Sequence, residues 1–192
     1  GLATSADGVR FAKVKDNPIY AFGDDRHSIL TPTLLREPGG DLLLENGQWK
    51  MWFSSTHFAG ASGRHALHLT TSNDGRNWSK PSGPLLENVY APTMIKEDGD
   101  DGLYRMWFTD VGSEPWLFRY AQSRDGRKWQ VDEQPILQVD QSWEQGRLFY
   151  PAVIRQNGVY LMWYGSYWSA QPHKTALGFA ASLDGRTSYK HP

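Results

Sequence analysis

Three short sequence marks recur along this 192-residue chain in a fixed order, and the repetition limits its fold more than any other feature. The first mark is a proline before a short apolar run, at Pro32, Pro92 and Pro151. The second is Met-Trp followed by an aromatic residue, at Met51, Met106 and Met162. The third is Ser-x-Asp-Gly, which begins at Ser5, Ser72, Ser123 and Ser182. Because the three marks stay in register, chance similarity is a poor explanation, and a repeated structural unit is indicated.

Each mark predicts one part of a small antiparallel sheet. A proline is tolerated at the first residue of a strand, where the missing N–H matters least. The Met-Trp segments are short and aromatic, which is typical of half-buried strands. An Asp-Gly pair between such runs predicts a tight turn, because glycine accepts the positive φ that the turn requires. With no sustained helical period in the chain, four antiparallel strands per repeat of roughly 60 residues predict a β-propeller blade.

The predicted blades do not fill the chain evenly. We expect a half-blade over residues 1–25, complete blades over 30–86 and 90–137, and a blade without its last strand over 148–192. The fold class is therefore all-β, a propeller or propeller fragment with about 3–4 blades. Either the chain is part of a longer protein, or the N-terminal half-blade completes the C-terminal blade, or separate chains pair through their open edges. An all-β sandwich with evenly spaced turns is the structural alternative.

Composition excludes several classes of function. The chain has no cysteine, so it holds neither disulfides nor a cysteine-based zinc or redox site. Its formal net charge of −1 lacks the basic excess of a nucleic-acid or anionic-membrane surface. No apolar run approaches the roughly 20 residues of a spanning helix, and the N-terminus lacks the zones of a signal peptide. The aromatic share of 14% indicates an aromatic core, an aromatic ligand face, or both.

Several phrases resemble those of the five-bladed β-propeller glycosidases, a superfamily that includes arabinanases, β-xylosidases, invertases and levansucrases. They are Tyr-Arg-Met-Trp-Phe (104–108), Tyr-Leu-Met-Trp-Tyr (160–164), Ala-x-Ser-x-Asp-Gly-x-x-Trp (121–129) and Trp-Glu-x-Gly-x-x-x-Tyr-Pro-Ala-Val-Ile (143–154). The resemblance covers nearly the whole chain and implies part of a five-bladed ring. It also implies an oligosaccharide or polysaccharide as partner and a secreted or periplasmic location, without a required cofactor. An axial calcium ion of the kind found in this family is not predicted from these residues.

The chain departs from the family at the positions that the resemblance assigns to catalysis. The family's acids stand immediately before a blade's proline, or two residues before it. Here the residues before the prolines are Thr31, Ala91 and Tyr150. None of them is an acid, and neither are the residues one position earlier. The departure leaves three readings open: the catalytic blade lies outside this chain, the acids have moved, or the protein is not a hydrolase.

Chain direction alternates within a blade, so the loops sort onto two faces. One face collects the loops between second and third strands and the connections between blades. Aromatic rings beside carboxylates suit a sugar, because rings cover C–H faces and carboxylates accept hydrogen bonds from hydroxyls. The candidate catalytic acids on this face are Glu144, Asp110 and Asp25. The candidate substrate-binding residues are Trp168, Tyr150, Arg147, Trp116, His27 and Tyr90.

Plainer readings stand beside each candidate. Asp110 can cap a turn, Glu144 can pair with Arg147, and Asp25 can belong to a solvated loop. The Met-Trp tryptophans are expected in the core and the Asp-Gly turns are expected to be structural. His57, His65 and His68 could suggest a metal site. His65 and His68 are three residues apart in an expected strand, so their side chains point to opposite sides of the sheet, and no metal site is predicted. The function predicted first is a glycosidase-like propeller that binds, and hydrolyses if the acids converge, an oligosaccharide. The alternatives are a non-catalytic carbohydrate-binding propeller and a protein-interaction scaffold.

Overall fold

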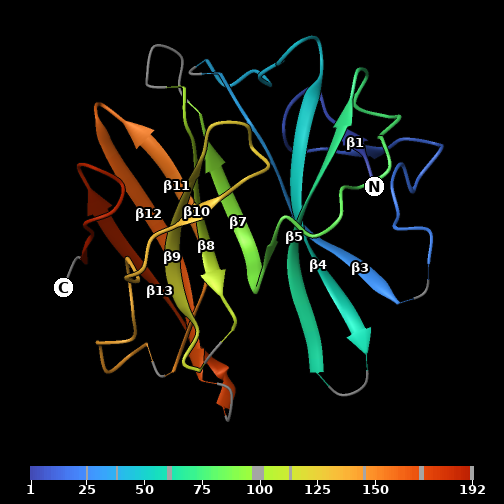
Figure 1. The fold of residues 1–192 in the computed structure, drawn as a ribbon. Coiled ribbons are helices and arrows are strands. Elements are labelled where there is room, and N and C mark those ends of the chain that lie inside the picture. Colours follow the sequence, from blue (N-terminus) through green and yellow to red (C-terminus); the bar gives the residue numbers. More distant parts are fainter. Residues whose placement is uncertain are drawn as a thin grey trace.

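The computed structural model describes residues 1–24, 26–37, 39–59, 62–96, 102–112, 114–144, 146–168 and 171–190. Within them the chain is all-β and has no helix, which confirms the predicted fold class. Three four-stranded antiparallel sheets lie side by side, and a two-stranded hairpin stands apart near the N-terminus (Figure 1). Among these residues there is no helix of the length and hydropathy that crossing a membrane requires.

The strands follow the sequence within each sheet, as in a propeller blade. The first blade contains β3 (His27–Leu34), β4 (Trp49–Ala59), β5 (Ser62–Ser72) and β6 (Leu86–Glu87). The second contains β7 (Val89–Ile95), β8 (Tyr104–Asp110), β9 (Leu117–Ser123) and β10 (Gln130–Val131). The third contains β11 (Arg147–Gln156), β12 (Val159–Trp168), β13 (Gln171–Ser182) and β14 (Tyr189–Lys190). The sequence predicted a third blade without its last strand, whereas the structure adds β14 at that edge.

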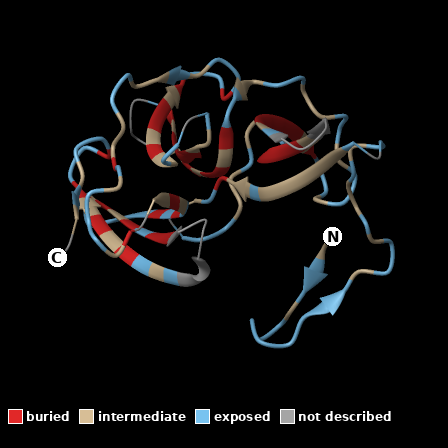
Figure 2. Ribbon diagram, turned by 90° about the horizontal axis from the view of Figure 1, so that it is seen from below, coloured by how far each residue is buried: buried red, intermediate tan, exposed pale blue. Residues whose placement is uncertain are grey.

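The N-terminal hairpin consists of β1 (Ala3–Thr4) and β2 (Ala12–Lys13), which pair only with each other. It extends away from the three blades and is exposed along most of its length (Figure 2). Its apolar side chains are also exposed, with Val9 at 80% and Phe11 at 65% of their full accessibility. The hairpin thus corresponds to the predicted half-blade, and its two strands do not pair with any other described strand.

Each blade's proline lies inside its first strand, at a bulge, and not at the strand's first residue as predicted. The register shifts between Leu30 and Thr33 in β3, and equivalent shifts occur in β7 and β11. The residue before the proline has a positive φ in every blade, at Thr31 (46°), Ala91 (48°) and Tyr150 (55°). A proline cannot donate to the ladder, so a bulge is one of the few places where a sheet accepts it. A left-handed conformation at three non-glycine residues is a local strain repeated in every blade.

The Ser-x-Asp-Gly turns are built in the same way in all four copies. In the second blade, the Ser123 hydroxyl accepts from the Gly126 N–H at 2.9 Å. Asp125 accepts from the two N–H groups that follow the glycine, both at 2.8 Å. Those backbone bonds hold the pKa of the Asp125 carboxyl below its ordinary value. The recurrence of this mark therefore has a structural cause, since the turn satisfies its own backbone.

Neighbouring blades are joined by a tryptophan of one blade and a glycine turn of the next. The Trp52 indole donates to the Gly126 carbonyl at 2.8 Å, and the Trp107 indole donates to the Gly185 carbonyl at 2.8 Å. Both tryptophans are buried, with 0% and 1% of their surface exposed. Trp163, the third of these tryptophans, is 45% exposed, which corrects the expectation that all three lie in the core.

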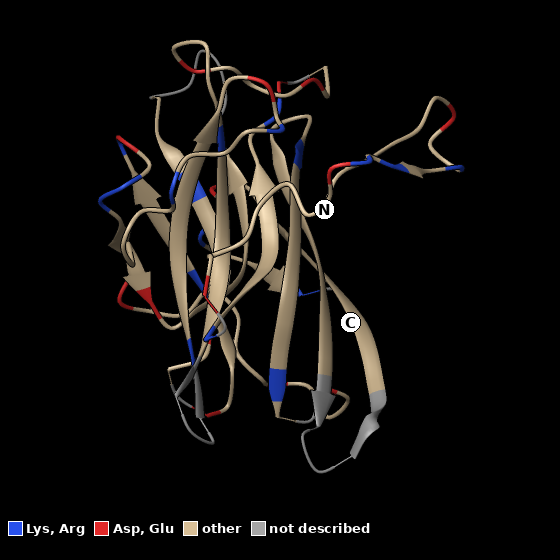
Figure 3. Cartoon of the chain, turned by 90° about the vertical axis from the view of Figure 1, so that its right-hand side faces the viewer, with Lys and Arg blue, Asp and Glu red and all other residues tan. Residues whose placement is uncertain are grey.

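Two core clusters fill the spaces between the blades, one around Trp52 and Met106 and one around Trp107 and Met162. The acidic residues lie mainly in the loops at the ends of the strands, whereas Lys and Arg also occur along the strands (Figure 3). The core thus holds the sheets together while the loops at the strand ends stay available for contacts with other molecules.

Candidate functional site

One end of the molecule, here called the strand-start face, is where the first strand of every blade begins. The ladders pair His27 with His57 in the first blade, Val89 with Asp110 in the second and Arg147 with Tyr167 in the third. The beginning of each first strand therefore lies beside the end of the second strand, and residues from all three blades meet at one end.

An aromatic group on the strand-start face links the second and third blades. The hydroxyl groups of Tyr90 and Tyr150 are hydrogen-bonded to each other, and their ring centroids lie 5.3 Å apart. The Tyr90 ring also contacts His65 of the first blade at 4.9 Å and Trp116 at 6.1 Å. We call these four residues, with Arg147 and Glu114, the tyrosine cluster. Tyr150 is 47% exposed, so the cluster presents an aromatic surface to solvent.

Arg147 fixes the charged side of the tyrosine cluster. Its guanidinium forms a two-point ion pair with Glu114, with Nε donating to Oε2 at 3.0 Å. It also lies over the Trp116 ring, 4.4 Å from the ring centroid. The backbone adds a connection, because the Leu148 N–H donates to the Trp116 carbonyl at 3.0 Å. A planar guanidinium held by a carboxylate and a ring keeps donors in a fixed direction, which suits recognition of polar oxygen groups.

The structure brings Tyr90, Tyr150, Trp116 and Arg147 of the predicted binding residues together in this cluster. His65 and Glu114 were not predicted as site residues: Glu114 lies in the loop between β8 and β9, whereas His65 lies on β5. Burial lowers the pKa of the His65 imidazole, and a backbone hydrogen bond at Ser55 partly offsets the effect. In the sequence, both residues stand between a Met-Trp segment and the next Ser-x-Asp-Gly turn. In the structure, His65 lies opposite Thr56 near the end of its strand pair.

Glu144 lies in a closed polar cage and away from the solvent surface, with 0% of its surface exposed. Its carboxylate accepts from the backbone N–H groups of Asp140 and Gln141, at 2.8 and 2.9 Å. It also accepts from the Tyr164 hydroxyl at 2.9 Å and from the Lys190 ammonium at 2.6 Å. Burial and the neighbouring Glu144 charge raise the pKa of the Tyr164 hydroxyl. All these donors belong to the protein, so the carboxylate is committed to holding its own surroundings.

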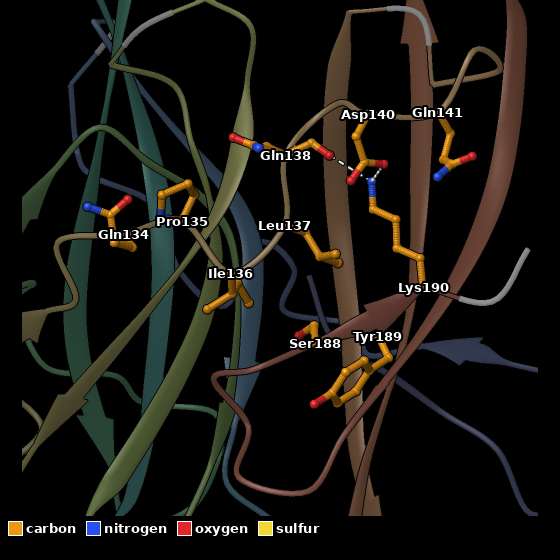
Figure 4. Close-up of a pocket in the computed structure, with 10 residues that line it drawn as sticks. All are labelled: Gln134, Pro135, Ile136, Leu137, Gln138, Asp140, Gln141, Ser188, Tyr189 and Lys190. Atoms are coloured by element: carbon orange, nitrogen blue, oxygen red, sulfur yellow. Dashed lines mark hydrogen bonds and ion pairs between the residues drawn. The ribbon is translucent and has the colours of Figure 1, made fainter.

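Lys190 reaches the same cage from β14. Its ammonium donates to Glu144. It also donates to Asp140 and to the Gln138 carbonyl, both at 2.7 Å (Figure 4). The lysine side chain is 9% exposed, whereas Asp140 is 51% exposed. Beside this ion pair, a shallow cavity of about 440 Å³ is lined by residues 134–138, 140, 141 and 188–190 (Figure 4).

Asp110 is also engaged within its own blade. Its carboxylate accepts from Arg119 Nε at 2.6 Å and from the Gly112 N–H at 2.9 Å. The Arg119 guanidinium continues to the carbonyls of Asp132 and Glu133. The pair therefore ties the loop after β8 to the edge of its sheet. Of the other predicted residues, Asp25 and the side chain of Trp168 lie outside the described residues.

His27 lies on the flank of the first blade and not in the tyrosine cluster. Its Nδ1 contacts the Asp24 carboxylate at 2.8 Å, and its ring stacks on His57 and Phe22 with centroids at 4.5 and 4.8 Å. A cavity of about 700 Å³ opens there, next to the buried His68. Burial lowers the pKa of the His68 imidazole. Over the described part of the chain, no group of three or more histidines and carboxylates is arranged to hold a metal ion.

The chain has a propeller fold, and solved structures that share this fold include glycoside hydrolases. A family 117 glycoside hydrolase from Zobellia galactanivorans superposes with a TM-score of 0.68 at 16% identity, over 90% of this chain and 58% of that one. The inulosucrase of Halalkalicoccus jeotgali, solved with kestose, gives 0.64 at 13% identity, over 88% and 53%. The sucrose-6-phosphate hydrolase of Lactobacillus gasseri gives 0.64 at 14% identity, over 84% and 33%. At these identities the likeness establishes the fold alone.

Two curated proteins of Mycobacterium tuberculosis strains, MT1551 and Rv1502, are similar in sequence. Each is 35% identical to this chain over 177 residues and is described as uncharacterized. The aligned part is 85% of this chain and 55% of each relative, so the chain spans about half the length of the curated relatives that it matches. No protein-family model matches the chain.

Proposed function

We propose that this propeller binds an oligosaccharide, and that the tyrosine cluster is the contact surface. The observation that carries the proposal is the joined surface of Tyr90, Trp116 and Tyr150 beside the Arg147–Glu114 pair. Aromatic faces cover the C–H surfaces of sugars, and a fixed guanidinium and carboxylate offer a donor and an acceptor to hydroxyl groups.

Two further observations support binding at this position. The surface is made by two blades and touches His65 of the first blade, so its shape depends on the assembled fold and not on a single loop. Tyr150 is the residue before the proline of the third blade and holds a strained left-handed backbone. Thr31 and Ala91 share this conformation, so it belongs to the blade; at Tyr150 it sets the direction of a large ring on the strand-start face. The glycoside hydrolase fold of the structural neighbours agrees with a sugar as ligand.

A glycan array on the intact chain, followed by calorimetric titration of the oligosaccharides that bind, tests this proposal. Replacing one stacking ring, by Tyr150→Ala or Trp116→Ala, is expected to weaken binding at least about tenfold, as loss of a central aromatic contact does. Tyr189→Ala is the matched control, because Tyr189 is 68% exposed but lies on β14, outside the cluster. Equal affinities in all three variants, or no oligosaccharide bound by the wild type, would contradict the proposal.

Hydrolysis is the second candidate, favoured by neighbours described as glycoside hydrolases, including one of family 117. The candidate catalytic acids differ in how far protein donors and burial occupy their carboxylates. Glu144 and Asp110 are both held by protein donors, as described above. Glu114 is also paired, with Arg147, but 56% of its side chain is exposed and it belongs to the tyrosine cluster, so we propose it together with Asp25 as the acids to examine.

The assay for hydrolysis is the release of reducing ends from an oligosaccharide that binds the wild type. If the chain hydrolyses it, Glu114→Gln or Asp25→Asn is expected to lower the rate by about a hundredfold or more, the order of a lost acid–base catalyst. Binding without release of reducing ends would leave the carbohydrate-binding function standing and remove the hydrolytic one.

A further inference from the structure

The outer side of the third blade is an apolar surface without a neighbour among the described residues. It includes a shallow cavity of about 660 Å³ lined by residues of β11, β12 and β13. Its apolar side chains are strongly exposed, with Leu177 at 87%, Ile154 at 48% and Trp163 at 45%. We call this surface the open blade face. Apolar surface of this kind, grouped around a large aromatic side chain, marks an interaction site.

The two inner joints show what the open blade face is built to receive. At both, the tryptophan of one blade fills the space above the glycine of the next blade's Ser-x-Asp-Gly turn. A Cβ added to Gly126 would lie 2.7 Å from the Trp52 ring, and one added to Gly185 would lie 3.0 Å from the Trp107 ring. In each case the indole N–H donates to that glycine's carbonyl. Trp163 occupies the equivalent position in the third blade, and its indole N–H has no acceptor in the part of the chain that the structure describes.

Comparison of the four Ser-x-Asp-Gly turns identifies one whose glycine is not covered by a tryptophan ring. Four Ser-x-Asp-Gly turns are described, and Gly75 is covered by Trp49 of its own blade. Gly126 and Gly185 are covered by Trp52 and Trp107. Of these four glycines only Gly8, in the N-terminal hairpin, has no atom within 4 Å of the added Cβ, although its turn has the same Ser5 and Asp7 hydrogen bonds as the others. The Gly75 carbonyl accepts from the Trp78 indole of its own turn at 3.1 Å. Among the described residues, the Trp163 indole of the last blade and the Gly8 turn of the N-terminal hairpin are thus left as a donor and an acceptor turn without a tryptophan–glycine contact.

We propose that the open blade face receives the N-terminal hairpin of a second copy of this chain, with the Trp163 indole donating to the Gly8 carbonyl. The hairpin and the third blade lie at opposite ends of the row of blades, so the two halves of the joint are separate within one copy (Figure 1). The contact is head-to-tail, which either closes into a ring of copies or continues as a longer assembly. It also covers Val9 and Phe11 of the hairpin, which are exposed in the single chain.

Measurement of the molar mass of the protein by light scattering, over a range of concentrations, tests this proposal. The wild type is expected to associate as concentration rises. Trp163→Ala and Gly8→Ala are each expected to weaken the association about tenfold or more, since each removes one half of the joint. Gly47→Ala is the matched control: its φ of +74° and open surroundings reproduce the backbone strain of Gly8, at +71°, outside the joint.

A mixture of the two variants separates loss of the joint from loss of folding. The Trp163→Ala chain retains an intact hairpin and the Gly8→Ala chain retains an intact open blade face. The mixture is therefore expected to form a pair that neither variant forms alone. A wild type that stays monomeric at every concentration overturns the proposal. So does a mixture that behaves as the sum of its parts, or a Gly47→Ala chain that loses association equally.

Discussion

Single residues set the geometry on which both the fold and the tyrosine cluster depend. The sequence predicts the Ser-x-Asp-Gly turns correctly because their hydrogen bonds are local. It does not predict that Tyr150 and Ala91 adopt a positive φ, since that conformation is imposed by the bulge around the following proline. Nor does it predict that Glu144 is caged, because Lys190 is distant in sequence and approaches only in the folded sheet.

The glycines of the inter-blade joints give a stability prediction at the residue scale. Gly126→Ala adds a methyl group 2.7 Å from the Trp52 ring at a φ of +71°, so strain and overlap act together. We expect a loss of about 2–4 kcal/mol in the free energy of unfolding, from left-handed strain plus overpacking. Gly158→Ala, with a φ of +82° and open surroundings, carries the strain alone and is expected to cost about 1 kcal/mol. Equal losses in denaturant titrations would show that the tryptophan does not fill the glycine's space.

Elements are held to one another by two ionic groups, one buried and one partly buried. Glu144 and Lys190 join the edge strand β14 to the connection before β11. Glu45 of the first blade joins Lys96 and Tyr104 of the second, with Lys50 of its own blade adding a further ion pair. The sequence marks indicate most of the strands, although not β14, and neither of these ties. The partners in each tie are distant in sequence, and a local sequence pattern carries no information on which distant side chains will meet.

Glu144→Gln tests the first tie. It leaves the ammonium of Lys190, 9% exposed, without its buried counter-charge, so we expect a loss of about 3 kcal/mol in the free energy of unfolding. Asp140→Asn removes an ion pair with the same lysine at a half-exposed position and is expected to cost under about 1 kcal/mol. Chemical denaturation of both variants at neutral pH measures the difference. A Glu144→Gln chain as stable as the wild type would show that the cage is not a structural tie.

The second tie predicts a dependence on pH. Burial acts to raise the pKa of the Glu45 carboxyl, but hydrogen bonds from Lys50, Lys96 and Tyr104 outweigh it and lower the pKa from 4.5 to about 2. A lowered folded-state pKa stabilises the fold above the unfolded value, and that contribution disappears as pH falls from about 4.5 to about 2. Glu45→Gln is therefore expected to lower stability by about 1–2 kcal/mol at about pH 7. The difference from the wild type should shrink over this acid range, and a constant difference would contradict the assignment.

For the whole molecule, the repeated marks are sufficient to predict an all-β propeller because every blade has the same proline-bearing strand, Met-Trp strand and Ser-x-Asp-Gly turn. They are not sufficient to predict the site, which depends on residues that break the repeat. Tyr150 replaces Thr31 and Ala91 of the other blades at the position before the proline, and Tyr90 stands one residue before Ala91. Their hydroxyl groups meet only because the second and third blades pack with their first strands adjacent.

The central claim is that the tyrosine cluster on the strand-start face binds an oligosaccharide. The most direct measurement follows the indole N–H signals of the nine tryptophans by two-dimensional NMR, during titration with an oligosaccharide selected on the array. The account predicts that the Trp116 signal shifts in proportion to binding, while those of the buried Trp52 and Trp107 stay in place. Saturable binding that leaves the Trp116 signal unmoved would contradict it.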